Sequence, residues 1–242
     1  MTEAAGEIRG VLFDKDGVLI DFAATWDPVN RRLAERMAGG DASLAARLLS
    51  AGGYDGEGAS LRPGTVLAAG TPPEVASAWI GHLPAWTEAA LAEEIDRFFD
   101  SASPELAVPL LDVAALFARL KGRGLALGVA TNDSELGARR GLERLGGLKR
   151  LDFLAGYDSG HGAKPAPGMA EAFCRATGLA ASEIAVVGDN LHDLDMGRAA
   201  GAGLLIGVRS GTGDPATLAA AAHHLIDSAA ELEGLLDGLY AR

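Results

Sequence analysis

Two aspartates stand two positions apart at the end of an apolar run near the N-terminus. The stretch V-L-F-D-K-D-G-V-L-I-D-F, residues 11–22, places Asp14 and Asp16 where a buried strand is predicted to end. A carboxylate such as Asp14 can attack phosphorus and form an aspartyl-phosphate. The second, Asp16, can protonate the leaving alkoxide and then take a proton from water. Asp and Gly are also ordinary turn residues, so the remaining chain decides between a turn and a site.

Five more residues that suit phosphoryl transfer follow later apolar runs. Ligands bind at the carboxyl ends of the strands in an open parallel sheet, so residues that follow predicted strands are expected to meet. These residues are Thr131 and Asn132 after the second predicted strand, Lys164 in a loop of the third α/β unit, and Asp189 and Asp193 after the fourth strand.

Charge neutralisation is the chemistry that these residues share. Mg²⁺ prefers oxygen ligands and is usually held by one or two carboxylates together with substrate phosphate, so Asp14 and Asp189 are the candidate ligands. Lys164 would place a fixed positive charge against the phosphoryl oxygens. The Thr131 hydroxyl and backbone N–H groups around Asn132 would donate hydrogen bonds to the same oxygens. Thr131 can also serve as the cap of the following helix.

Asp193 and two histidines lie beside the residues named above. Asp193 is a candidate for orienting Lys164 or a metal-bound water, and the alternative is an acid in the first turn of a helix, favoured by the helix dipole. His161 and His192 are near the motif residues. Separated histidines are usually loop or helix residues, so we count neither as a ligand.

The elements that must position these residues alternate between strands and helices from about residue 108 onward. Such alternation indicates parallel α/β units. Residues 184–188, I-A-V-V-G, are continuous and β-branched, as a strand covered on both faces should be. The other strands are predicted at residues 125–130, 151–156, 203–208 and 224–226.

Residues 22–104 have a different pattern, because they show helical apolar spacing and no convincing buried strand. We interpret them as an inserted helical module. Its middle, residues 52–64, is too rich in Gly for a stable helix and is interpreted as a loop that closes over something. Arg62 in this loop is the candidate for pairing with a substrate carboxylate. The alternative is that Arg62, Tyr54 and Asp55 only shape the loop.

Composition limits the classes of function. The chain has 242 residues and a formal charge of -12, which argues against nonspecific binding to nucleic acid or to an anionic membrane. Its single cysteine, Cys174, rules out an internal disulfide and a multi-cysteine zinc site, and fits a reducing compartment. We find neither a signal peptide pattern nor the roughly 18 uninterrupted apolar residues that a membrane span needs. The expectation is a cytoplasmic protein.

The motifs D-K-D-G-V, T-N, K-P and G-D-N-L-H-D occur in this order after α/β strands. They resemble the four motifs of the haloacid dehalogenase-like superfamily, and the helical insertion after the first motif resembles its type-1 cap. The resemblance covers essentially the whole chain. It implies an α/β fold with a Rossmann-like, doubly wound parallel sheet core at residues 1–21 and 105–242, and a mobile all-helical cap at 22–104.

The same resemblance implies roles for the aspartates. Asp14 would be the nucleophile, Asp16 the acid and base and also a metal ligand through its backbone carbonyl, and Asp189 a metal ligand in a Mg²⁺-dependent site. The arrangement is most similar to phosphoglycolate phosphatase and its relatives. The expected partner is therefore a small phosphorylated metabolite, hydrolysed through an aspartyl-phosphate, with phosphoglycolate the first candidate.

Two alternatives and two departures accompany that hypothesis. A β-phosphoglucomutase-like phosphotransferase shares the cap type and all four motifs, whereas a noncatalytic binding module is disfavoured because both Asp14 and Asp16 are present. Val18 stands where many relatives carry Thr, which the family tolerates. Lys15 also resembles sugar-bisphosphate and histidinol-phosphate phosphatases, but those usually lack this cap and often carry a cysteine-histidine zinc loop. The dehalogenase branch does not use a second aspartate.

Overall fold

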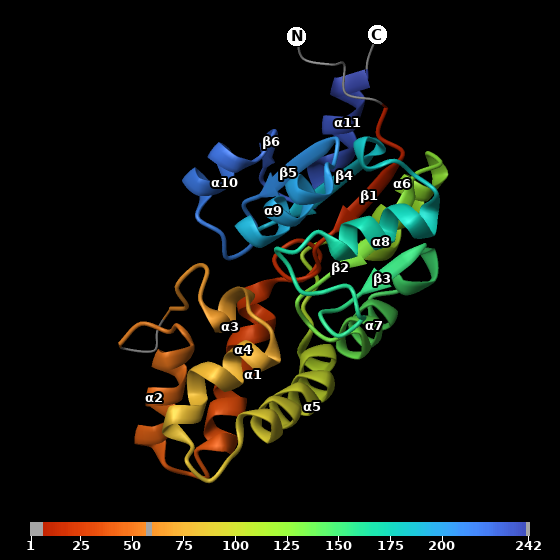
Figure 1. The fold of residues 1–242 in the computed structure, drawn as a ribbon. Coiled ribbons are helices and arrows are strands. Elements are labelled where there is room, and N and C mark those ends of the chain that lie inside the picture. Colours follow the sequence, from red (N-terminus) through yellow and green to blue (C-terminus); the bar gives the residue numbers. More distant parts are fainter. Residues whose placement is uncertain (1–6, 57–59, 241–242) are drawn as a thin grey trace.

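The computed structural model describes residues 7–56 and 60–240 and contains one parallel six-stranded sheet (Figure 1). Its strand order is β3-β2-β1-β4-β5-β6. The chain therefore runs outward from β1 to β3 and then returns to the other side of β1, so the strand order reverses between β1 and β4. The strands are β1 (Gly10–Phe13), β2 (Ala126–Ala130), β3 (Phe153–Ala155), β4 (Ile184–Gly188), β5 (Leu204–Val208) and β6 (His224–Ile226).

Three inner strands of the sheet are buried along their whole length. Every residue of β1, β4 and β5 is buried, as expected for parallel strands covered on both faces. Leu12 of β1 lies opposite Gly128 of β2 on one side and opposite Val186 of β4 on the other. The ends of β1, β2 and β4 therefore lie at one edge of the sheet.

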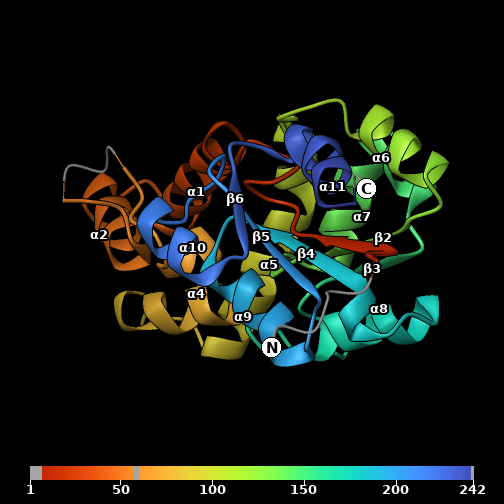
Figure 2. The same cartoon turned by 90° about the horizontal axis from the view of Figure 1, so that it is seen from above.

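Helices cover both faces of the sheet (Figure 2). Phe117 and Leu142 belong to an apolar cluster with Phe13 on one face, while Met169 and Phe173 belong to a cluster with Leu12 on the other. This arrangement confirms the predicted α/β class with a doubly wound parallel sheet. One face carries α6 (Val113–Gly122), α7 (Glu135–Arg144) and α11 (Leu232–Tyr240), and the other carries α8 (Gly168–Thr177), α9 (Leu191–Ala200) and α10 (Pro215–Ala221).

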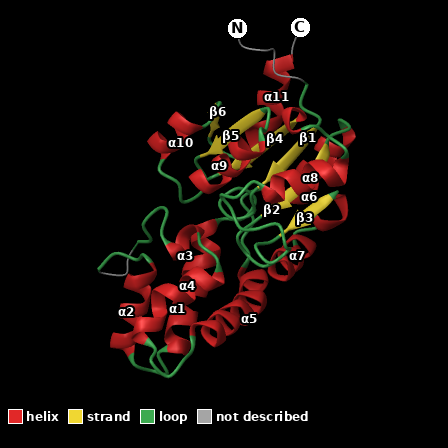
Figure 3. Cartoon of the chain, in the orientation of Figure 1, coloured by secondary structure: helices red, strands yellow, loops and turns green. Residues whose placement is uncertain are grey.

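The segment between β1 and α6 is helical and lies beside the carboxyl ends of the strands (Figure 3). Trp79, Leu48 and Ile95 are fully buried in an apolar cluster of its own, which explains the helical spacing seen in the sequence. The proposed domain boundaries at residues 22 and 104 remain a prediction. The helices are α1 (Phe22–Met37), α2 (Ala42–Gly52), α3 (Val66–Ala69), α4 (Pro72–Trp79) and α5 (Glu88–Leu106).

Short 3-10 turns complete the elements, and one predicted strand is shorter than expected. Residues 151–156 were predicted as a strand, but β3 spans only Phe153–Ala155. Asp152 uses its carboxylate to accept from the Leu127 N–H, and Gly156 lies so close to the start of α7 that an added Cβ would be 2.2 Å from the Glu135 nitrogen. The turns are Ile80–His82, Leu148–Arg150, Ala181–Glu183 and Ala229–Glu231.

No helix within residues 7–56 and 60–240 combines the length and the low polarity needed to cross a bilayer.

Candidate active site

The seven residues predicted from the motifs line one cavity at the carboxyl edge of the sheet. Its other wall comes from the helices between β1 and α6, and includes Trp26 of α1 and Phe99 of α5. The seven are Asp14, Asp16, Thr131, Asn132, Lys164, Asp189 and Asp193.

The ends of two neighbouring strands place the first two carboxylates. Asp14 follows β1 and Asp189 follows β4, and the register pairs Phe13 with Val187. The Asp14 N–H also donates to the Val187 carbonyl at 2.8 Å, which extends the pairing to the last residue before the turn. The strand pairing therefore brings together two acids that are far apart in the sequence.

Lys164 lies between two buried carboxylates. Its Nζ donates to Asp14 Oδ1 and to Asp193 Oδ1, both at 2.6 Å. Burial acts to lower the pKa of Lys164, but the charges of Asp14 and Asp193 outweigh it and raise the pKa above its usual range. Lys164 therefore remains a cation beside the predicted nucleophile.

Asp193 also caps the start of α9. Its second oxygen accepts from the Asn190 N–H at 3.0 Å, while the Asn190 side chain accepts from the His192 N–H. This reciprocal pattern is a capping box. The two interpretations of Asp193 are compatible, since one carboxylate oxygen contacts Lys164 and the other begins the helix.

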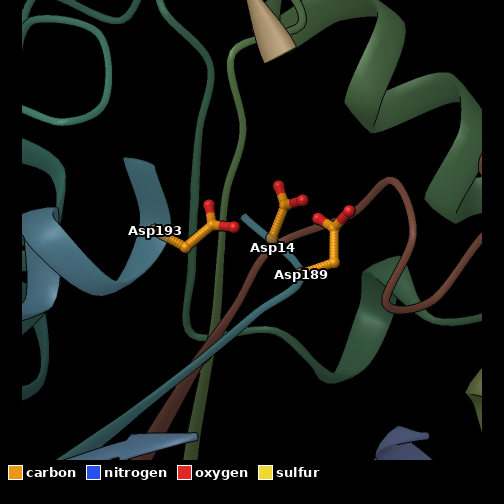
Figure 4. Close-up of side chains that lie close together, drawn as sticks. All are labelled: Asp14, Asp189 and Asp193. Carbon is orange, nitrogen blue, oxygen red and sulfur yellow. The ribbon is translucent and has the colours of Figure 1, made fainter. Parts of the chain in front are cut away.

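Asp14, Asp189 and Asp193 converge above the strand ends, with carboxylate oxygens within 4.8 Å of one another (Figure 4). Burial raises the pKa of Asp14 well above its usual range, although Lys164 opposes the shift. Burial and the neighbouring Asp193 raise the pKa of Asp189 to about 7. Three buried carboxylates facing one lysine concentrate negative charge. A hard divalent cation with oxygen ligands fits this donor set.

Asp16 has a separate set of partners, although it is only two residues from Asp14. Its Oδ1 accepts from Trp26 Nε1 at 2.6 Å and its Oδ2 lies 3.0 Å from Lys15 Nζ. Lys15 also donates to Asp133 Oδ2 at 2.7 Å. Burial lowers the pKa of Lys15, but Asp133 and Asp16 raise it above its usual range. The side chain of Asp16 is not part of the three-carboxylate cluster.

Gly17 makes the turn that directly follows Asp16. Its φ is 78°, and an added Cβ would come within 2.6 Å of the Asp189 carboxylate. The Gly17 N–H donates to the Ile20 carbonyl at 2.7 Å, and the Ser210 hydroxyl donates to the Gly17 carbonyl. The turn therefore needs Gly both for its backbone conformation and for space next to Asp189.

Thr131 and Asn132 follow β2 into the cavity. The Thr131 hydroxyl accepts from the Asp133 N–H at 3.1 Å. The N-cap of α7 is Ser134, which accepts from the Gly137 N–H, so the suggestion that Thr131 caps this helix was wrong. Asn132 uses Oδ1 to accept from the Lys164 N–H at 2.9 Å. Its Nδ2 donates to the Ala69 carbonyl of α3 at 2.9 Å.

The Gly-rich loop does not bring its conspicuous side chains into the cavity. The Tyr54 hydroxyl is directed to Asp27 Oδ1 at 2.8 Å, and Arg62 Nε donates to the Gly53 carbonyl. Neither Tyr54 nor Arg62 lines the cavity, so these contacts agree with the loop-shaping alternative. Residues 57–59 of this loop lie outside the described residues.

Sequence reasoning missed several contributors to the site. Asp133 follows Asn132 directly, so the strand-end argument could have included it. Trp26 and Asn30 line the cavity from α1, and Thr212 donates to Asp189 Oδ2 from its backbone N–H at 2.6 Å. No local pattern marks these three residues, because their role depends on chain segments that meet only in the fold.

Comparison with known proteins agrees with this geometry. A family model described as haloacid dehalogenase-like hydrolase matches residues 8–201. A phosphoglycolate phosphatase from Xanthomonas campestris pv. campestris (strain 8004) is 32% identical over 211 residues, covering 86% of this chain and 87% of that protein. An N-acetylmuramic acid 6-phosphate phosphatase from Pseudomonas aeruginosa is 28% identical over 195 residues, covering 80% and 79%.

The fold is similar to that of solved structures. The crystal structure of a β-phosphoglucomutase from Clostridium difficile superposes with a TM-score of 0.65 at 17% identity, covering 97% of this chain and all of that one. At this identity the likeness concerns the fold alone.

Proposed function

This chain belongs to the haloacid dehalogenase-like hydrolases, and we propose that it is a cytoplasmic, Mg²⁺-dependent phosphatase that hydrolyses a small phosphate monoester through an aspartyl-phosphate on Asp14. The observation that carries the proposal is that two neighbouring acids, Asp14 and Asp16, have different partners. Asp14 lies 2.6 Å from the Lys164 ammonium and faces Asp189, whereas Asp16 is held apart by Lys15 and Trp26 on the same cavity.

The first half of the reaction forms the covalent intermediate. An oxygen of Asp14 attacks phosphorus, and the bond from phosphorus to the alcohol oxygen breaks. Asp16 gives its proton to that oxygen, so the alcohol leaves neutral. Lys164 and backbone N–H groups near Thr131 and Asn132 stabilise charge on the phosphoryl oxygens.

The second half restores the enzyme. Water attacks phosphorus, Asp16 takes a proton from that water, and the bond from phosphorus to the Asp14 oxygen breaks. Inorganic phosphate is released, and Asp14 is again a carboxylate. Asp16 thus alternates between acid and base. Its contacts with Lys15 and Trp26 keep its carboxylate apart from the cluster around Lys164.

Asp14 and Asp189 are the residues that would hold Mg²⁺, together with the backbone carbonyl of Asp16. The ion would supply positive charge to offset repulsion between the attacking carboxylate and the phosphate. Asp193 would act on this site through its contact with Lys164. The helices α1 to α5 would serve as a cap, because they form the wall opposite the strand ends.

The first substrate to test is 2-phosphoglycolate, since phosphoglycolate phosphatases are among the similar proteins. Phosphate release should be measured on a panel of small esters with Mg²⁺ or EDTA. We expect metal-dependent release, and a loss of about a thousandfold or more in Asp14→Asn, because an amide cannot form the intermediate. Full turnover in that variant would refute the covalent mechanism. Transfer of phosphate between hydroxyls of one sugar, with little free phosphate, would favour the mutase alternative.

A further inference from the structure

The cap wall of the cavity is almost entirely apolar, except for Asn30 of α1. Its lining is formed by aromatic and aliphatic side chains of α1, α3, α4 and α5, and the polar atom of Trp26 already donates to Asp16. Asn30 lies four residues after Trp26, on the same face of the helix. Among the described residues of this wall, Asn30 is the one whose side-chain amide is left to bind a ligand. The apolar members include Phe22, Leu67, Pro72, Val75 and Phe99.

The Asn30 amide is buried without a partner. Its side chain belongs to a fully buried residue, and neither Oδ1 nor Nδ2 makes a hydrogen bond. The Tyr54 hydroxyl is a polar neighbour of Asn30, but it donates its proton to Asp27 Oδ1. Buried polar groups in folded proteins nearly always have a partner, because leaving one unpaired costs desolvation energy. A molecule bound in the cavity is the partner that the position of Asn30 suggests.

A second unpaired group faces the same cavity from the core. Six buried side-chain atoms lack a hydrogen-bond partner within the described part of the chain, and His192 Nδ1 is one of them. His192 and Asn30 both line the cavity and together account for three of the six atoms. The unsatisfied polar atoms are therefore concentrated where a ligand would bind.

The charges around the cavity disfavour a second anionic group on that ligand. Lys164 is bound to Asp14 and Asp193, and Lys15 to Asp16 and Asp133. With Asp189 included, five carboxylates face two ammonium groups, and the Mg²⁺ proposed above would still leave a formal excess of one negative charge before the phosphate binds. None of the described residues on the cap wall is a cation, and Arg62 does not line the cavity. A carboxylate on the leaving alcohol would be buried there without a cation.

Resting on the phosphatase function proposed above, we infer that the alcohol part of the natural substrate is uncharged. It carries a hydroxyl or amide group that bonds to Asn30, and its carbon skeleton packs against the apolar wall of α1, α3 and α4. The substrate class is then a phosphate monoester of a polyol, sugar or similar neutral alcohol, in preference to a phosphorylated carboxylic acid such as 2-phosphoglycolate.

Matched pairs of esters test the inference on the unmodified protein. Glycerol 3-phosphate and 3-phosphoglycerate differ only in a hydroxymethyl group against a carboxylate, and 2-hydroxyethyl phosphate and 2-phosphoglycolate differ in the same way. With Mg²⁺ present, we expect kcat/KM to be at least about tenfold higher for the hydroxyl member of each pair. Equal values, or higher values for the carboxylates, would overturn the inference and leave the phosphatase standing. Silence on all four esters, and on the wider panel, would instead overturn the phosphatase proposal and this inference with it.

Two variants test the role of Asn30. Asn30→Leu should raise KM for the hydroxyl esters and reduce the preference within each pair to about twofold or less. Ser103→Ala is the matched control, because Ser103 Oγ is also buried in the cap without a partner but does not line the cavity. Ser103→Ala should keep the preference. Thermal unfolding should show both variants folded, and Asn30→Ala replaces Asn30→Leu if leucine does not fit. An unchanged preference in folded Asn30 variants would refute this role.

Discussion

The cavity has two halves that are built on opposite principles. The core half is formed by the residues that follow the strands, and the cap half is formed by α1, α3, α4 and α5, the helices of the proposed cap. In the core half the charged side chains are tied to one another, as Lys164 is to Asp14 and Asp193. In the cap half the wall is apolar, and the buried Asn30 amide has the Tyr54 hydroxyl as a polar neighbour but makes no hydrogen bond of normal geometry. In the proposed function, the core half provides fixed charges that any phosphoryl group can use. The cap half provides a shaped surface and one unused amide, which suit discrimination between alcohols.

Trp26 is the point where the two halves meet. It belongs to a cap helix, packs edge-on against Phe99 with ring centroids 5.0 Å apart, and donates its indole N–H to Asp16. Lys15 holds the other oxygen of the same carboxylate from the core. The acid and base of the proposed reaction is thus positioned jointly by both halves. Substitutions in the core, at the junction and in the cap should have effects of decreasing size on the chemistry.

Apart from the loss of the proposed nucleophile in Asp14→Asn, the largest effect is expected from Asp189→Asn in the core half. The change removes one charge from the three-carboxylate cluster, and phosphate release should fall by about a hundredfold or more for every ester. Mg²⁺ should raise the Tm of the unmodified protein through preferential binding to the folded state, and this rise should be lost in the variant. Differential scanning fluorimetry with Mg²⁺ or EDTA measures it.

The control for that experiment is Asp195→Asn. Asp195 lies on α9 close to the cluster but pairs with Arg198 at the surface. This variant should keep both the turnover and the Mg²⁺-induced rise in Tm. A rise that persists in Asp189→Asn would show that the cation is held elsewhere.

An intermediate effect is expected from Trp26→Phe at the junction. Phenylalanine keeps an aromatic ring beside Phe99 but removes the donor to Asp16, so kcat for alkyl phosphates should fall about tenfold. Aryl phosphates need less protonation of the leaving oxygen, and their first step should be less affected. Single-turnover rates with an alkyl and an aryl ester give this ratio.

Trp79→Phe provides the matched control for Trp26→Phe. Trp79 is a buried tryptophan of the cap whose Nε1 has no partner and which does not line the cavity. Its replacement should leave the alkyl-to-aryl ratio unchanged. Equal losses for both esters in Trp26→Phe would mean that Trp26 supports the fold and does not position Asp16.

The smallest effect is expected from Asp96→Asn on α5, and it concerns the stability of the fold. Burial and the neighbouring Asp100 raise the pKa of Asp96 on α5 to about 6. The folded state then holds the proton more tightly than the unfolded chain, so this group reduces stability as pH rises from about 4 through about 6. Asp96→Asn should therefore stabilise the protein at pH 8 by about 1 kcal/mol or less, because Asp96 is partly exposed and solvent screens its charge.

The gain from Asp96→Asn should shrink as the pH falls from 8 toward 4, as measured by urea unfolding across that range. Glu93→Gln makes the same charge change at an exposed site on the same helix and serves as the control. A gain in Asp96→Asn that does not depend on pH would contradict this explanation.

Much of the core half was predictable because its residues follow recognisable strands. A buried parallel strand must be apolar along its length, so 184–188 marked β4 and the residue after it, Asp189. The same reasoning located Asp14 and Thr131. Neighbouring parallel strands end at one edge, and the meeting of these side chains is a consequence of the pairing of β1 with β2 and β4.

The cap half was predictable as helices but not as a binding surface. Helical spacing indicates which residues face a core, since an apolar stripe must be buried. It does not indicate which helix end faces the strand ends, so Arg62 was a candidate for the substrate and Asn30 was not. The bond from Trp26 to Asp16 likewise depends on how α1 packs beside the turn at Gly17.

The order of the motifs was sufficient to predict the sheet and the position of Asp14 among the acids around it, because hydrophobic pattern and strand ends are local properties of the chain. The partners of each charge were decided by tertiary packing. Lys15 reaches Asp133 across 118 positions, and Lys164 reaches Asp14 across 150. Local patterns cannot predict such contacts, because burial, pairing and the unsatisfied amide of Asn30 exist only after distant segments have packed together.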